Sequence, residues 1–322
     1  MNRFGLGVWT HSITGFRSRD EVEAQADLWA KAGYDIVIPC VKNPHGAADF
    51  LTDAADVNPD YPEWDPLKLM VEACKARGIK VHVWFCVFPE GDRSRLLREH
   101  PQFQAKFEAK HRWACACRPE VQDYLFELYK SVALRYRPAG LHLDYIRTGG
   151  ICTCEFCKAE MHRRGVEIAD VELRNPAYEQ WVEWRVSRIT DFVSRLREFT
   201  RSENLELSAA VFAGYPDSRR TQGQDWIEWA EKGLVDYLLP MNYTNSTRWA
   251  AARTISHAAL IGGKAPLWEG LGKSSSASQL TTEVLTEQVK AVLAAGAQGI
   301  VLFSDPAVTE ADIQAVQQLR SA

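Results

Sequence analysis

Short apolar runs alternate with longer amphipathic stretches along the chain from residue 5 to residue 321. The runs are rich in β-branched and aromatic residues, which favours strands. The stretches between them repeat apolar residues at three- and four-residue steps, which favours helices. The predicted strands are 5–11, 35–41, 80–88, 140–146, 206–214, 235–244, 265–271 and 299–305. The main predicted helices are 19–32, 65–78, 119–136, 176–201, 224–232, 247–260, 282–295 and 309–321, with a short additional helix at 155–164.

Eight repeats of a strand followed by a helix predict a single (β/α)8 barrel, also called a TIM barrel, over residues 1–322. Such a barrel needs about 250 residues, so the surplus predicts extended loops after strands two, three and four. The structural alternative is an open doubly wound sheet. That fold usually has fewer strands, and no G-x-G-x-x-G motif follows the first strand here.

The charges nearly balance, with 38 Lys and Arg against 42 Asp and Glu and no block of one sign. This balance argues against a nucleic-acid partner and against a polybasic membrane patch. The sequence has no apolar run of membrane-spanning length and no apolar signal-peptide core at its N-terminus, so we expect no membrane partner. We expect a cytoplasmic chain, or a secreted or periplasmic one if a leader was trimmed. The oligomeric state stays open.

Polar and aromatic side chains gather at the carboxyl ends of the predicted strands, where TIM barrels place their sites. In the fourth strand, GLHLDYI, alternation puts Leu141 and Leu143 on one face and His142 and Asp144 on the other. The leucines belong against the helices, so we expect Asp144 to point into the barrel mouth. The alternative is a structural Asp144 that is bonded to His142 or Arg147.

A second acid, Glu269, lies near the end of the seventh strand in PLWEG. Two carboxylates facing one cleft suit glycosidic cleavage, because one protonates the leaving oxygen while the other attacks the sugar or activates water. We favour Asp144 as the proton donor and Glu269 as the nucleophile, and the arrangement in which the strand-four Asp144 is the nucleophile stays open. Glu269 is alternatively a substrate clamp or a loop residue. The candidate substrate-binding residues are Trp9, His11, Lys42, Trp84, His142, Arg147, Asn242, Tyr243, Trp268 and Asp305, with the three tryptophans as stacking platforms.

Three segments resemble the family 10-like glycosyl hydrolases: CRPEVQDYLFELYKSVALRY, GLHLDYIR and QDWIEWAEKGLVDYLLPMNYT. The pattern of that family is a Pro-Glu-Val helix, then Gly-x-His-Leu-Asp-Tyr-Ile-Arg, and then a Pro-Met-Asn-Tyr strand. The resemblance covers most of strands three to six and, through strand order, nearly the whole chain. It implies a barrel glycosidase in which Asp144 is a catalytic carboxylate and His142, Arg147, Asn242 and Tyr243 shape the sugar subsite. It says nothing of the sugar.

Two positions depart from related patterns. PMNYT also looks like the Met-x-Tyr-Asp strand of family 18 chitinases, but Thr244 stands where those enzymes have their Asp, which weakens the case for substrate assistance. After Arg147, Thr148 and two glycines replace the usual Tyr-Pro, so the subsite beside Asp144 is expected to differ in shape. These departures support an alternative function, a catalytically silent barrel that binds carbohydrate.

Five cysteines lie in two predicted loops, with Cys115 and Cys117 after strand three and Cys152, Cys154 and Cys157 after strand four. Neighbouring strands of a barrel end on the same face, so the two loops can meet. The thiols suffice for a four-coordinate structural Zn²⁺ site with one left over, and we expect no organic cofactor. Disulfides between the loops and free thiols are the alternatives. A hydrolase or lyase that uses the Cys-bound ion is a third functional hypothesis.

Overall fold

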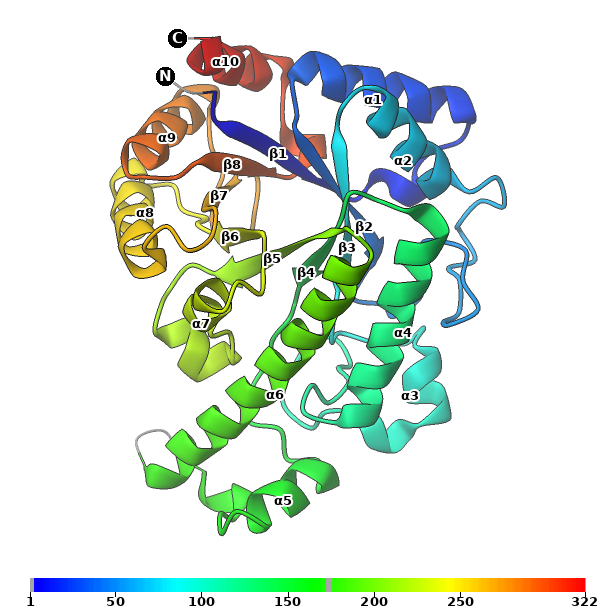
Figure 1. Cartoon of the computed structure of the whole chain (residues 1–322), viewed down its shortest axis with the longest axis vertical. Helices are drawn as coiled ribbons and strands as arrows, with labels where there is room; N and C mark the ends of the chain where they lie inside the picture. Colours follow the sequence, from blue (N-terminus) through cyan, green and yellow to red (C-terminus); the bar gives the residue numbers. More distant parts are fainter. Residues whose placement is uncertain (1–2, 172–174, 322) are drawn as a thin grey trace.

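Eight parallel strands form a closed barrel in which each strand pairs with its neighbours in sequence order and β8 closes on β1. This computed structural model describes residues 3–171 and 175–321. Helices surround the strands (Figure 1), so the chain folds as the predicted (β/α)8 barrel. The strands are β1 (Gly5–Thr10), β2 (Ile36–Lys42), β3 (Lys80–Cys86), β4 (Gly140–Asp144), β5 (Glu206–Phe212), β6 (Tyr237–Met241), β7 (Trp268–Gly272) and β8 (Gly299–Phe303).

The predicted main helices are all present. They are α1 (Arg19–Ala32), α2 (Pro66–Ala76), α4 (Pro119–Tyr136), α6 (Pro176–Ser202), α7 (Trp226–Glu231), α8 (Thr247–Ile261), α9 (Thr282–Ala294) and α10 (Glu310–Ser321). Shorter helical segments are η1 (Ser12–Thr14), α3 (Arg95–Glu99), η2 (Pro101–Phe103), α5 (Glu155–His162), η3 (Ile168–Asp170), η4 (Ser218–Gln222) and η5 (Asp305–Ala307). Within the described ranges, no helix combines the length and apolar character needed to cross a bilayer.

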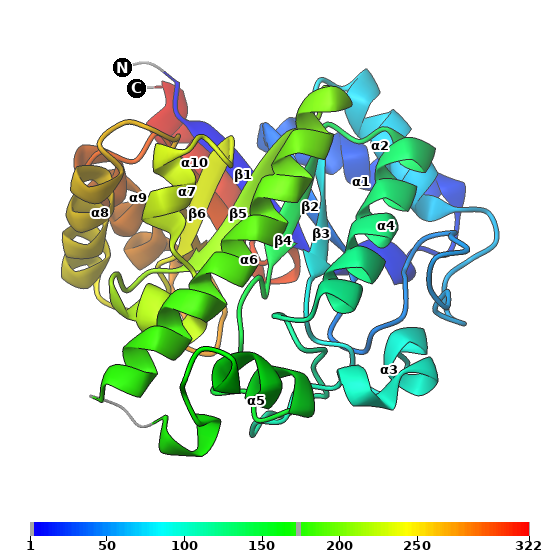
Figure 2. The same ribbon diagram turned by 60° about the horizontal axis from the view of Figure 1, so that its bottom comes forward.

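The connections after β2, β3 and β4 are long, as predicted, and two of them carry α3 and α5. Figure 2 shows α3 and α5 at the end of the barrel that lies opposite the two chain termini. The extra residues of the chain therefore build up the rim at one end of the barrel.

Local sequence signals account for the bounds of several elements. The Ser18 hydroxyl accepts from the Glu21 amide at the start of α1, and Gly33 ends that helix with a left-handed φ of 78°. The fourth strand is shorter than predicted, because Tyr145 takes a φ of 51° and breaks the extended run directly after Asp144. That left-handed residue sits at the barrel mouth.

The strands present two buried faces. Leu141 and Leu143 are fully buried in the large cluster between strands and helices, as their alternation predicts. Trp9, Trp84 and Trp268 belong to a second, smaller cluster that fills the barrel interior. Because successive side chains point to opposite faces, His142 and Asp144 turn inward.

A chain of polar side chains also runs through the interior. Trp9 Nε1 donates to His142 Nε2 at 3.0 Å, so neutral His142 carries its proton on Nδ1, which lies 2.8 Å from the Ser208 hydroxyl. The same hydroxyl lies 2.9 Å from His82 Nδ1, and His82 Nε2 lies 2.9 Å from the Glu206 carboxylate. Burial, with the nearby His82, holds the pKa of His142 well below its ordinary value, so this ring stays neutral. We call these five residues the interior hydrogen-bond chain.

Candidate active site at the barrel mouth

A cavity of about 520 Å³ opens at the carboxyl ends of the strands, within the size range of small-ligand sites. Its walls include the last residues of five strands, Cys86, Asp144, Phe212, Met241 and Phe303. The remaining lining residues are Trp9, His11, Pro44, Trp84, Tyr145, Arg147, Ala210, Ala213, Gly214, Tyr243, Arg253, Ser275, Ser276 and Ala277. The cavity thus brings together six of the predicted site residues, Trp9, His11, Trp84, Asp144, Arg147 and Tyr243.

Asp144 is the one carboxylate among the described residues that line this cavity. Its side chain is 8% exposed, and its Oδ1 accepts from the Tyr145 amide at 2.6 Å and lies 3.7 Å from Arg147 Nη1. Burial raises the pKa of Asp144, against the opposing effects of Arg147, the Tyr145 amide and Trp84. The carboxyl therefore holds its proton more readily than an ordinary aspartate does, which suits a proton donor.

Two buried donors flank Asp144. Arg147 is held between aromatic rings, with its guanidinium carbon 4.1 Å from the Tyr145 ring centroid and 4.6 Å from that of Phe212. Its Nη1 and the Trp84 Nε1 make no hydrogen bond within the described chain, although Trp84 is close enough to Asp144 to lower the pKa of that carboxyl. Both donors face the Asp144 carboxyl, with Arg147 Nη1 in a long ion pair of 3.7 Å, and their remaining hydrogen-bonding capacity can serve oxygen atoms of a ligand.

Aromatic rings form much of the remaining wall. The His11 ring centroid lies 4.7 Å from that of Trp84 and 6.2 Å from that of Phe303, and Tyr243 packs against Phe303 at 5.4 Å. Burial lowers the pKa of His11, which favours its neutral form. Flat apolar faces with polar edges suit the alternating CH and hydroxyl groups of a sugar ring.

The prediction that Glu269 faces the same cleft as Asp144 is wrong in this structure. Glu269 is fully buried between β7 and α8, where its Oε1 lies 2.7 Å from Nδ1 of His257. His257 donates through Nε2 to the Ala213 carbonyl at 2.7 Å, so the pair supports a loop of the cavity wall from behind. The reason is alternation along β7, which turns Trp268 into the barrel and Glu269 outward.

Trp268 does not line the cavity either. It is the first residue of β7, and its indole fills the opposite end of the barrel interior, beside Gly5, Gly299 and the Tyr237 ring at 5.1 Å. A Cβ on Gly5 would lie 2.0 Å from this indole, so the two glycines make room for it. Trp268 is therefore a core residue rather than a platform at the mouth.

Lys42 and His142 are also turned away from the cavity. Lys42 is completely buried, with Nζ 3.0 Å from Oε1 of Glu90 and hydrogen-bonded to three carbonyls at the end of β3 and in the loop after it. His142 lies one level below Asp144 as part of the interior hydrogen-bond chain. Both hold the barrel together, and neither reaches a ligand at the mouth.

Asn242 and Asp305 lie outside the cavity as well. The Asn242 amide donates to the Ala250 carbonyl at 3.0 Å and so fixes the start of α8. Asp305 accepts from the Trp29 indole at 3.2 Å, in a separate hollow between α1 and α10. Asp305 begins η5 just after β8 and does not belong to the strand end itself.

Several lining residues escaped the sequence prediction, Arg253 and Phe303 among them. Arg253 reaches the cavity from α8, and its position on a helix gives no strand-end signal in the sequence. Phe303 is the last residue of β8, and Val301 in the interior cluster shares its side of the strand. The signal for Phe303 was therefore present in the alternation of GIVLF.

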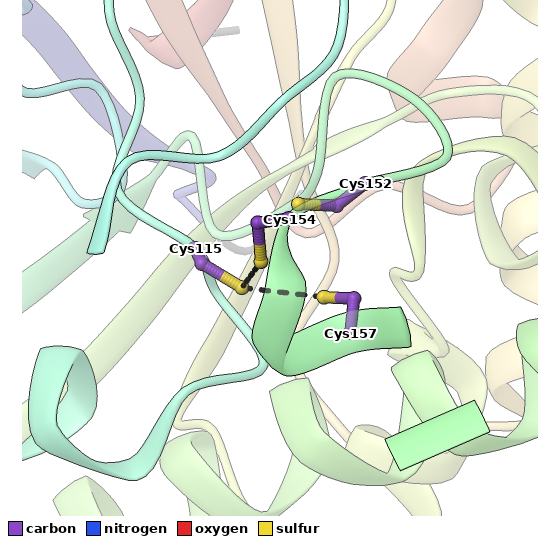
Figure 3. A group of neighbouring side chains, drawn as sticks. All are labelled: Cys115, Cys152, Cys154 and Cys157. Carbon is purple, nitrogen blue, oxygen red and sulfur yellow. Dashed lines mark hydrogen bonds between the residues drawn. The ribbon is translucent and has the colours of Figure 1, made fainter. Parts of the chain in front are cut away.

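The two cysteine-bearing loops meet, as predicted from the adjacency of β3 and β4. Cys115 of the first loop lies among Cys152, Cys154 and Cys157 of the second (Figure 3), and all four sulfur atoms are within 4.8 Å of one another. Cys117 adjoins Cys115 and Cys157. All eight cysteines of the chain are free thiols in this structure.

Comparison with known proteins finds relatives of this chain among the glycosyl hydrolases. Glycosyl hydrolase DigH of Escherichia coli strain K12 is 27% identical over 290 residues, covering 74% of this chain and 62% of that protein. The chain thus spans about three fifths of the length of the curated relatives it matches. The glycoside hydrolase domain of PgaB (BpsB) from Bordetella bronchiseptica superposes with a TM-score of 0.78 at 15% identity, over 98% of both chains.

The catalytic domain of a β-amylase from Paenibacillus polymyxa superposes with a TM-score of 0.67 at 10% identity, over 99% of this chain and 97% of that one. At such low identities, the two structural likenesses concern the fold. The family described as Glycosyl hydrolase-like 10 matches residues 19–261, which is most of the chain and includes Asp144. The chain therefore belongs to the glycosyl hydrolase-like 10 family.

Proposed function

We propose that this protein hydrolyses glycosidic bonds of an oligosaccharide or polysaccharide, with Asp144 as the proton donor. The observation that carries the proposal is the position of Asp144, a buried acid with a raised pKa at the end of β4, in a cavity walled by aromatic rings. Membership of a glycosyl hydrolase-like family supports the same reaction class.

The surroundings of Asp144 suit both states of a general acid. Before transfer, burial raises the pKa of Asp144 and so favours the protonated carboxyl. When the proton moves to the glycosidic oxygen, the new carboxylate faces Arg147 Nη1 at 3.7 Å and the Tyr145 amide at 2.6 Å. These fixed donors stabilise the charge that develops on Asp144 during bond cleavage.

The nucleophile is proposed to come from outside the protein. Because the cavity lining that the structure describes holds no second carboxylate, attack on the sugar carbon falls to water or to a neighbouring group of the substrate itself. Attack by water inverts the configuration at that carbon, whereas participation by a substrate group retains it. The stereochemistry of the product therefore distinguishes the two routes.

The same observation favours a second candidate, a barrel that binds carbohydrate without cleaving it. Glycosidases usually need two acids, and Glu269 does not reach the cleft that holds Asp144. Under this alternative, Arg147 and Trp84 are hydrogen-bond donors to a sugar that dissociates unchanged.

The test is a glycan-library screen that measures both binding and release of reducing ends. Asp144→Asn is the test variant, and Asp305→Asn is its matched control, because burial also raises the pKa of Asp305 but this residue lies outside the cavity. We expect Asp144→Asn to lose about 10²- to 10⁴-fold in turnover, with Asp305→Asn near the parent value.

Anomer-resolved NMR of the first product then assigns the route of attack. A parent protein that binds a glycan but releases no reducing ends supports the silent barrel. Full turnover by a folded Asp144→Asn variant refutes the proposed role of Asp144.

A further inference from the structure

Four buried thiols converge at the rim of the barrel, beside the candidate active site. Cys115 Sγ lies 3.4 Å from Cys157 Sγ and 3.7 Å from Cys154 Sγ, and Cys152 completes a group within 4.8 Å (Figure 3). Zn–S bonds of about 2.3 Å in a tetrahedron place sulfur atoms about 3.8 Å apart. The sulfur–sulfur spacing of this group is therefore closer to that of four thiolates around one tetrahedral ion than to that expected of unrelated cysteines in a core.

Backbone amides point at two of these sulfur atoms. The Lys106 amide donates to Cys152 Sγ at 3.4 Å, and the Cys157 amide lies against the Cys154 sulfur. Hydrogen bonds to sulfur favour the thiolate form, which is the form that binds a metal.

A buried cation adjoins the cluster and has only neutral hydrogen-bond partners. Arg185 is fully buried, and its guanidinium donates to the Thr148 hydroxyl and to carbonyls of residues 219–221. None of these groups carries a negative charge, yet buried charges are normally paired. Arg185 acts electrostatically on Cys117, which adjoins Cys115 and Cys157. Four thiolates around one Zn²⁺ carry a net charge of −2, which would supply the missing counter-charge.

We propose that Cys115, Cys152, Cys154 and Cys157 bind one structural Zn²⁺ ion. Cys117 lies outside the set of four ligands and is the cysteine on which the charge of Arg185 acts. With four protein ligands the ion has no open position for water or substrate, so its role is structural rather than catalytic.

The site joins two segments that shape the wall around Asp144. Trp113, two residues before Cys115, packs on the Tyr145 ring at 5.8 Å, and Arg147 lies five residues before Cys152. Arg185 bonds Thr148, the residue between Arg147 and the glycines. The Zn²⁺ ion thus fixes the loop that presents Arg147 and Tyr145 to the cavity, and its removal loosens that loop.

The test is the metal content of the purified chain, measured by inductively coupled plasma mass spectrometry. We expect one zinc per chain in the parent, and loss of zinc in Cys154→Ser and Cys157→Ser. Two variants serve as controls that keep zinc: Cys117→Ser beside the site, and Cys74→Ser, a buried thiol of α2. Replacement by Co²⁺ should give the visible absorption of a tetrahedral thiolate site.

Two further measurements cover variants that fail to fold. A strong chelator applied to the parent should speed proteolysis within residues 145–171 and leave the far-UV circular dichroism of the barrel unchanged, and Zn²⁺ should restore the protection. Metal-free parent protein that does not take up Zn²⁺ overturns the proposal. Iron in place of zinc, disulfides among the four cysteines, or loss of zinc in Cys117→Ser but not in Cys154→Ser also overturns it. None of these readouts depends on glycosidase activity.

Discussion

The buried pair of Glu269 and His257 provides the sharpest test of the site described above. Both side chains are at most 2% exposed, and the two atoms that face each other are 2.7 Å apart. Because Nε2 of His257 donates to a carbonyl, an ionised Glu269 requires a proton on Nδ1 as well; at an effective dielectric of about 20, such a charged pair attracts by about 6 kcal/mol before desolvation is counted. Removing one partner of a buried pair costs about 3–5 kcal/mol. We expect Glu269→Ala to lower the free energy of unfolding by that amount.

Glu269→Gln keeps the volume and one acceptor oxygen for His257, so we expect a smaller loss, about 1–3 kcal/mol. Urea denaturation at fixed pH measures both values. On a glycan that the parent cleaves, the folded fraction of Glu269→Gln should turn over within a few-fold of the parent rate, because Glu269 reaches the cavity only through His257 and Ala213. The comparison with Asp144→Asn distinguishes a residue that supports the cavity wall from one that takes part in the reaction.

A contrary result is easily recognised. If Glu269→Gln unfolds at the same urea concentration as the parent but has lost turnover as completely as Asp144→Asn, then Glu269 takes part in catalysis and the cleft rearranges when substrate binds. If both properties are unchanged, the buried pair contributes nothing and the electrostatic reasoning fails.

Three further results are expected. Because the pKa of Asp144 is raised on folding, its ionisation destabilises the fold as pH rises. Asp144→Asn should therefore have a higher free energy of unfolding than the parent at pH 7. This difference should shrink as pH falls toward 3.8, the ordinary pKa of Asp. A parent that is the more stable protein at pH 7 contradicts this. Arg147→Gln removes a charge that lowers the pKa of Asp144, so the alkaline limb of the pH–rate profile should move to higher pH. A shift to lower pH excludes Asp144 as the general acid. Lys42→Met leaves the buried Glu90 without its counter-charge, which should cost about 3–5 kcal/mol in urea denaturation with KM unchanged. A raised KM with intact stability would instead return Lys42 to the substrate site.

The sequence was sufficient for the barrel and for the direction of Asp144, because periodicity and alternation are local signals. Leu141 and Leu143 identify the helix-facing side of β4, and their neighbours must then face inward. In β7 the segment PLWEG offers Trp268 and Glu269 as candidates, and residue type alone does not show which faces inward. The packing of Trp268 against Gly5 and Gly299 decides it, and that contact joins segments far apart in the sequence.

Prediction from the sequence is limited in the same way for residues on the loops. Adjacency of β3 and β4 is enough to predict that Cys115 meets the second group of cysteines, some 40 residues later. Which four thiols form the close group depends on the path of each loop, which no periodic pattern encodes. Asp305 shows the same limit, since it begins η5 after β8 and its carboxylate accepts from Trp29 of α1 instead of facing the cavity.

The interior hydrogen-bond chain determines how this barrel tolerates mutation. Replacing Ser208 alone by Ala leaves ring nitrogens of both His82 and His142 buried without their partner, which costs more than the hydroxyl itself contributes. Replacing the members together by apolar side chains of similar volume avoids that penalty. Double-mutant cycles along the interior hydrogen-bond chain should therefore show strongly non-additive changes in stability. These positions tolerate substitution best when they are exchanged together, in engineering as in evolution.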